Sequence, residues 1–131
     1  MRLKSFSLNF GLQLYKAFSD EARVRLLNLL HKKGEMCISD LELTLDFTQT
    51  KTSRHINYLK NAGLLSFRRQ DLYAFYGIKE EMKEVVRELL ELVEKDAVLK
   101  KDEEVYSILN SNRELAVNKI QRRVYSGSAK E

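Results

Sequence analysis

Apolar residues recur at helical spacing in two adjacent stretches near the start of the chain. The first stretch predicts a helix over about 7–18, with an apolar side formed by Leu8, Leu12, Tyr15 and Phe18. Ser19 and Asp20 then supply an N-cap, and apolar positions continue to Leu30 before cations and Gly34. These signals predict a second helix that ends next to Gly34.

Two shorter helices follow in close succession. Ser39 and Glu42 have the spacing of a capping box, which predicts the start of a third helix. Thr48 is placed to cap a fourth helix, over 48–62, which closes at Gly63. Two short helices joined by a few residues, the second of them polar and basic, are typical of a helix-turn-helix.

The hydrophobic period changes to about two after Gly63. Residues 66–76 alternate around a charged tip, which predicts a β-hairpin. A pronounced helical stripe then predicts a helix over 79–96. We expect more helix beyond residue 98, in one piece or two, with a frayed end from Ser126.

Together these elements predict a mainly α winged helix-turn-helix fold in the order α-α-α-α-β-β-α, with an extra C-terminal helical tail. The length of 131 residues fits one domain with an appendage, so we expect a winged-helix domain over 1–97 and a helical extension over 98–131. Five Gly and no Pro are too few turn residues for a sandwich or barrel.

Charge is unevenly distributed in a chain whose net charge is only +4. The segment 48–69 contains no acidic residue, and its cations are Lys51, Arg54, Lys60, Arg68 and Arg69. A local basic stretch of this kind favours a polyanionic partner.

The fourth helix has one apolar and one polar side. Thr52, Ile56 and Leu59 share the first side, while Thr50, Arg54, Asn57 and Asn61 lie opposite. Arg can donate two hydrogen bonds to guanine and Asn can bond adenine, so this side has groups that read base edges. A solvated polar face of a helical bundle is the alternative interpretation.

Three segments carry a resemblance to one family. Residues 47–65 resemble the recognition helix and the start of the wing of the ArsR/SmtB winged-helix repressors, 18–30 resemble their second helix, and 36–41 resemble the start of their third. The resemblance covers about residues 10–95 and leaves the tail unassigned. By position, it implies DNA contacts from Gln49, Thr50, Lys51, Ser53, Arg54, Asn57, Arg68 and Arg69.

The resemblance also implies a homodimer built from the first helix and the helix at 79–96. The apolar stripe of the latter is wide enough to need a partner. The expected interface residues are Leu8, Leu12, Tyr15, Val86, Leu89, Leu90 and Val93.

Metal sensing, which is common in this family, is not expected in this chain. Cys37 fills the first position of the family's Cys-x-Cys pair, but Ser39 fills the second. One Cys and two His cannot supply the converging ligands that a soft metal needs, so we expect no metal and no cofactor. Cys37 is then either a small buried residue, which we favour, or a redox-sensitive thiol before a helix N-terminus.

The sequence therefore predicts a homodimeric, sequence-specific transcriptional regulator that represses by binding a palindromic operator in double-stranded DNA. The alternative is a winged-helix protein-interaction module without DNA binding. Neither a glycine-rich phosphate loop nor a convincing catalytic triad is present, so we expect no enzyme activity. We expect a cytoplasmic protein that does not span a membrane, and the effector stays unassigned.

Overall fold

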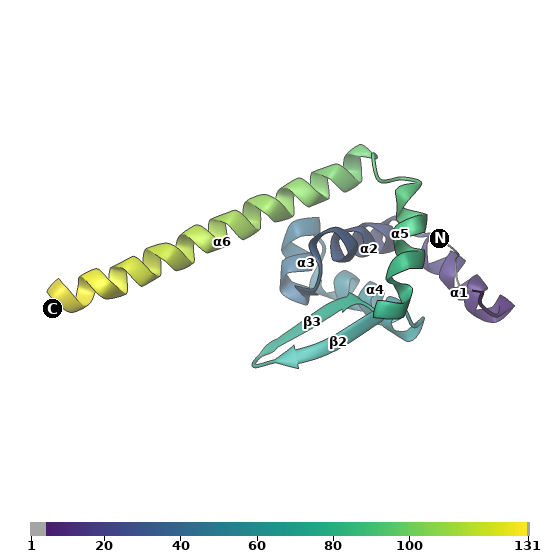
Figure 1. The fold of residues 1–131 in the computed structure, drawn as a ribbon, viewed down its shortest axis with the longest axis horizontal. Helices are drawn as coiled ribbons and strands as arrows, with labels where there is room; N and C mark the ends of the chain where they lie inside the picture. The colour runs from purple at the N-terminus through teal and green to yellow at the C-terminus, as the bar shows by residue number, and fades with distance from the viewer. Residues whose placement is uncertain (1–4, 131) are drawn as a thin grey trace.

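The computed structural model describes the backbone of residues 5–130 and the side chains of residues 5–113. It has the predicted mainly helical architecture, with a small sheet beside the helices (Figure 1). In chain order the elements are α1 (Leu8–Ala17), α2 (Glu21–Lys33), β1 (Met36–Cys37), α3 (Ile38–Leu45), α4 (Gln49–Asn61), β2 (Leu65–Gln70), β3 (Tyr73–Ile78), the 3₁₀ turn η1 (Glu80–Met82), α5 (Lys83–Glu91) and α6 (Ala97–Lys130).

Local capping fixes where α2 and α4 begin. The Asp20 carboxylate accepts a hydrogen bond from the Arg23 amide, and the Thr48 hydroxyl oxygen accepts one from the Lys51 amide. Each bond satisfies an amide that has no partner within its helix. Both helices start at the predicted caps, and α2 ends at Gly34, whose φ is 80°.

The predicted capping box of α3 is wrong. The helix begins at Ile38, so Ser39 lies inside it, and its N-cap residue Cys37 makes no side-chain capping bond. The reason is that Met36 and Cys37 pair with β3, so the chain passes directly from a strand into the helix. The Ser39 hydroxyl lies 3.3 Å from the Cys37 Sγ instead of capping.

The sheet has the order β1-β3-β2 and is antiparallel throughout. The predicted hairpin is confirmed as β2 and β3, while the short strand β1 was not predicted. Tyr76 lies between Met36 and Phe67 in the register, and Phe75 lies between Cys37 and Arg68. Met36 and Tyr76 are buried in the core, whereas Phe67 on the outer strand is exposed.

The helix predicted over 79–96 is shorter than expected. It consists of the turn η1 and the helix α5, and residues 92–95 form a turn. Val86 and Leu90 are fully buried within this single chain, and Leu89 packs against the same core. The apolar stripe of α5 is therefore used for the core of its own chain, which corrects the expectation that Val86 and Leu90 contact a partner.

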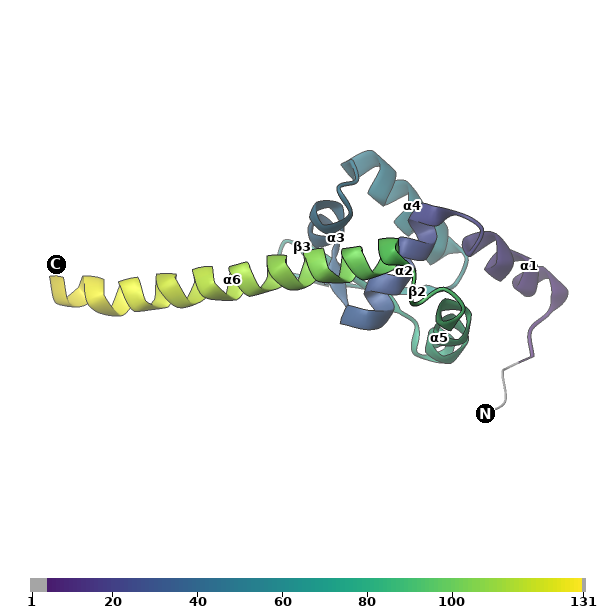
Figure 2. The same cartoon turned by 90° about the horizontal axis from the view of Figure 1, so that it is seen from above.

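The tail forms one continuous helix of 34 residues. Figures 1 and 2 show α6 crossing α2 and α3 and then projecting beyond them. Four polar contacts hold its first half: Arg25 with Asp102, Asn28 with Glu103, Lys33 with Ser107, and Asp40 with Arg113. The backbone stays helical past Ser126, where we expected fraying, and the side chains from residue 114 onward lie outside the described ones. No helix of the described part is long and apolar enough to cross a membrane.

Candidate nucleic-acid interface

The helix α4 is held by one side and leaves its polar side open. Thr52, His55, Ile56 and Leu59 are buried, and the Thr52 hydroxyl donates a hydrogen bond of 2.9 Å to the Thr48 carbonyl. The side chains of Gln49, Thr50, Arg54 and Asn57 are exposed, whereas those of Lys51 and Ser53 are half-buried. The structure therefore brings all six predicted residues of this helix onto or beside one accessible face.

The two cations on this face, Arg54 and Lys51, differ in the contacts that they make within the protein. Arg54 makes no hydrogen bond or ion pair with any described residue, so its guanidinium is available for a ligand. The Lys51 ammonium lies 4.2 Å from the centre of the Phe47 ring, a cation–π contact that orients the side chain without neutralising it. The helix contains no acidic residue, so nothing on it repels a phosphate backbone.

Contacts behind the exposed face connect α4 to α2. The Arg23 guanidinium lies 4.1 Å from the Tyr58 ring centre and donates a hydrogen bond to the Lys16 carbonyl. Burial lowers the pKa of His55, a nearby Asp20 carboxylate opposes that shift, and the charges of Arg54 and Arg23 add to it. His55 is therefore neutral at pH 7 and serves as a packing residue of this helix.

The two wing arginines differ in their surroundings. Arg68 donates a hydrogen bond of 2.7 Å to Glu35 and another of 2.6 Å to Gln70, and it lies 4.5 Å from the Phe75 ring centre. Arg69 is the next residue along the strand, so it points to the opposite face. Only Arg69 retains an uncompensated charge, because Glu35 already neutralises Arg68.

Lys60 completes the basic surface and was not among the predicted contact residues. Its ammonium lies 5.1 Å from the Phe67 ring centre, and the Arg69 guanidinium lies 5.9 Å from the same ring. Phe67 thus brings a cation from α4 and a cation from the wing to one side of the molecule. The sequence signal that could have indicated Lys60 is its position in the segment 48–69, which is basic and contains no acidic residue.

The expected interface residues divide between surface and core. Leu8 and Tyr15 on α1 are 78% and 65% exposed, and Leu12 and Val93 are exposed as well. Leu92 is 81% exposed beside Val93 and was not predicted. Figures 1 and 2 both place α1 and α5 at the end of the molecule opposite the projecting end of α6.

Cys37 is buried, 8% exposed, at the junction of β1 and α3. Within the described residues, no group of three or more His, Cys, Asp or Glu side chains is arranged to hold a metal ion.

Comparison with known proteins agrees with this geometry. The family model described as bacterial regulatory protein, arsR family, matches residues 20–66, which run from α2 to the start of β2. The chain is 35% identical to the arsenic resistance transcriptional regulator ArsR2 of Pseudomonas putida over 79 residues, which cover 60% of this chain and 69% of that protein.

Two further comparisons extend this similarity. The chain is 40% identical over 67 residues to the arsenical resistance operon repressor of Escherichia coli, covering 51% of this chain and 57% of that protein. The match thus spans little more than half of that repressor. The structure resembles HlyU from Vibrio cholerae with a TM-score of 0.59 and 27% identity, covering 66% of this chain and 97% of HlyU.

Proposed function

Because this chain belongs to the ArsR family of bacterial regulatory proteins, whose members regulate transcription and are not enzymes, we propose that it is a homodimeric repressor that binds a palindromic operator. The observation that carries the proposal is the exposed, acid-free face of α4, with Arg54 unpaired among the described residues. A face of this composition suits base edges and phosphates in a major groove.

Each protomer would place α4 in the major groove and the wing beside it. Gln49, Thr50, Ser53, Arg54 and Asn57 are the candidates for base contacts. Lys51, Arg69 and Arg68 are the candidates for phosphate contacts, and Lys60 joins them on the side of Arg69. We expect Arg68 to contribute less, since binding a phosphate would require it to leave or share Glu35.

We place the dimer surface on α1 and the turn after α5. Leu8, Leu12 and Tyr15 form an exposed apolar strip on α1, and Leu92 and Val93 expose further apolar surface at the same end of the molecule. Exposed apolar side chains gathered at one end are typical of a protein interface. Residues 1–97 would then supply both the DNA-binding and the dimerisation surfaces, with α6 bracing α2 and α3.

The effector is not a soft metal or metalloid in this proposal, although the relatives from Pseudomonas putida and Escherichia coli are regulators of arsenic or arsenical resistance. Cys37 is the only thiol of the chain, it is buried, and its neighbour Ser39 offers a hydroxyl where a second thiolate would be needed. The site of action is the cytoplasm, where the operator lies.

Selection of bound sites from a random pool of duplex DNA tests the proposal. We expect enrichment of a pseudo-palindrome whose half-site centres are about one helical turn apart, roughly 34–36 Å. Enrichment of no sequence, with binding that depends only on salt, would contradict sequence-specific repression. It would favour the alternative of a winged helix that acts by binding other proteins.

A further inference from the structure

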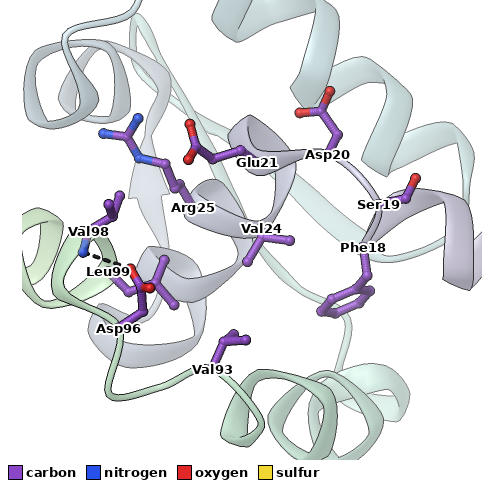
Figure 3. Close-up of a pocket in the computed structure, with 10 residues that line it drawn as sticks. All are labelled: Phe18, Ser19, Asp20, Glu21, Val24, Arg25, Val93, Asp96, Val98 and Leu99. Carbon is purple, nitrogen blue, oxygen red and sulfur yellow. Dashed lines mark hydrogen bonds between the residues drawn. The ribbon is translucent and has the colours of Figure 1, made fainter.

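A pocket of about 360 Å³ lies between the α1–α2 turn, the first turns of α2 and the segment that joins α5 to α6 (Figure 3). This volume is within the range of about 300–1,000 Å³ that small-molecule sites occupy. No residue proposed to contact DNA lines the pocket, so it is separate from the surface of α4 and the wing.

Apolar side chains form the inner walls of this pocket. Phe18, Val24 and Val93 come from three different segments and point toward the same space in Figure 3, and Leu99 of α6 lines it as well. Phe18 and Val24 are only half-buried, so part of their apolar surface is in contact with water. A ligand with an apolar group would remove that surface from water and gain free energy by doing so.

The charged groups around the pocket are predominantly negative. Asp20, Glu21 and Asp96 contribute three carboxylates, which the N-termini of α2 and α6 offset only in part, by about half a charge each. Among the described residues, Arg25 is the only cation that lines the pocket, and its Nε and Nη2 each donate a hydrogen bond of 2.9 Å to the buried Asp102. Asp102 therefore compensates Arg25, and Arg23 lies 3.9 Å from Asp20 in an ion pair. Glu21 and Asp96 leave the pocket with net negative charge.

Two of these carboxylates retain capacity to bind a ligand. Asp96 uses Oδ1 to accept the Val98 amide at 2.8 Å, and its second oxygen has no partner among the described residues. Glu21 makes no hydrogen bond with a described residue. An anion would be repelled here, whereas an ammonium or amidinium group would find acceptors next to the apolar walls.

We infer that this pocket binds a small organic cation, an amine or amidine attached to an apolar group, and that its occupancy regulates DNA binding. The regulatory part rests on the function proposed above. The pocket joins the segment of Val93, in the proposed dimer surface, to α2, whose Arg23 stacks on Tyr58 of α4. A ligand that binds one arrangement of these segments more tightly shifts the population toward it.

Titration of the free protein with three matched compounds tests the chemical class. The probes are phenethylammonium, neutral 2-phenylethanol and anionic phenylacetate, followed by amide chemical shifts. We expect shifts centred on residues 18–25 and 93–99, with phenethylammonium bound at least about fivefold more tightly than the alcohol, as for a partly exposed ion pair. Equal binding of the three compounds, or shifts elsewhere, would overturn the proposed site.

Two variants with matched controls locate the binding. Asp96→Asn removes a charge but keeps a side chain that can cap α6, so it should lower the affinity for phenethylammonium without unfolding the chain. Val98→Trp should fill the pocket and abolish binding. The controls are Glu104→Gln and Ile108→Trp, which change exposed residues elsewhere on α6 and should leave binding unchanged. If the two controls lost binding while Asp96→Asn and Val98→Trp kept it, the proposed location of the site would be wrong.

Operator binding measured with and without saturating phenethylammonium tests the regulatory part. We expect the Kd for DNA to change at least threefold in the wild type and not in Val98→Trp, which corresponds to a coupling of about 0.7 kcal/mol. Binding of the probe without a change in Kd would overturn regulation through this pocket. Absence of any DNA binding would instead overturn the proposed function, because the titration is done on the free protein.

Discussion

Arg113 of α6 donates two hydrogen bonds to the carboxylate of Asp40, which lies 73 positions earlier at the start of α3. The Nη1–Oδ2 distance is 2.7 Å, and Nη2 bonds the other oxygen. Asp40 is buried, so its charge depends on this partner, and the bonded carboxylate raises the pKa of Arg113 above its usual value. The first helix of the helix-turn-helix is thereby joined to the tail.

Arg113→Gln should destabilise the fold by roughly 1–3 kcal/mol, because it leaves a buried carboxylate without its charged partner. The half-exposed Arg113 side chain lets water replace part of the loss, which argues for the lower part of this range. Urea unfolding measures the change. The double variant with Asp40→Asn should recover part of the stability, and Lys101→Gln should have no effect. A stable single variant would show that the pair does not support the fold.

Arg54→Ala should weaken operator binding by roughly 1–3 kcal/mol and relax the preference at one position in each half-site, as expected for a bidentate base contact. Competition binding with operators substituted at single positions measures both effects. Arg54→Lys keeps the charge but not the fork of donors, so it should restore affinity without preference. Unchanged affinity and preference in Arg54→Ala would exclude α4 as the reading helix.

The two wing arginines should respond differently to the same substitution. Arg69→Ala should lower the slope of log Kobs against log salt by about one unit, because one phosphate contact is lost. Arg68→Ala should change the slope less, since Glu35 already pairs with this side chain. A larger effect for Arg68 would mean that its ion pair opens when DNA binds.

Leu12→Asp should dissociate the dimer and leave the protomer folded, because Leu12 is already exposed in the single chain. Sedimentation equilibrium and circular dichroism separate these two properties. The neighbouring exposed Gln13 provides the control Gln13→Asp, which should stay dimeric. By contrast, Val86→Asp should unfold the chain, since the carboxylate would lie unpaired in the core. A wild type that sediments as a monomer at micromolar concentration would contradict the proposed assembly.

Stability should decrease as the pH falls below about 6.5, the ordinary pKa of histidine. Burial lowers the pKa of both His55 and His31 in the folded state. The unfolded chain therefore takes up protons at a higher pH than the folded chain does. As the pH falls, the free energy of unfolding decreases by up to about 1.4 kcal/mol per pH unit for each imidazole, until the pH reaches the pKa of the folded state. Urea unfolding at pH 7.5 and 5.5 measures the loss. His55→Gln should reduce the loss, and an equal loss in that variant would show that His55 does not contribute.

Local signals in the sequence were sufficient for the helix-turn-helix and the wing. Asp20 and Thr48 cap α2 and α4 as predicted, because a cap depends on residues only three positions away. The two-residue strand β1 was missed, since two residues show no period. Its pairing with β3 also displaced the predicted start of α3 from Ser39.

The apolar stripe on α5 predicted burial correctly, and for Val86 and Leu90 the covering residues belong to the same chain. A hydrophobic period indicates that one side of a helix is covered, and it does not say whether Val86 meets the same chain or another. The ion pairs of Arg68 with Glu35 and of Arg113 with Asp40 could not be predicted from the sequence either. Their members lie 33 and 73 positions apart and meet only in the folded chain.

The length of α6 has a hydrodynamic consequence. A helix of 34 residues is about 51 Å long at 1.5 Å per residue, and Figure 1 shows much of it projecting from the rest of the molecule. Such a rod increases friction in solution without adding much mass. Gel filtration should therefore indicate a larger assembly than the chain forms, and light scattering should return the true mass of the same peak.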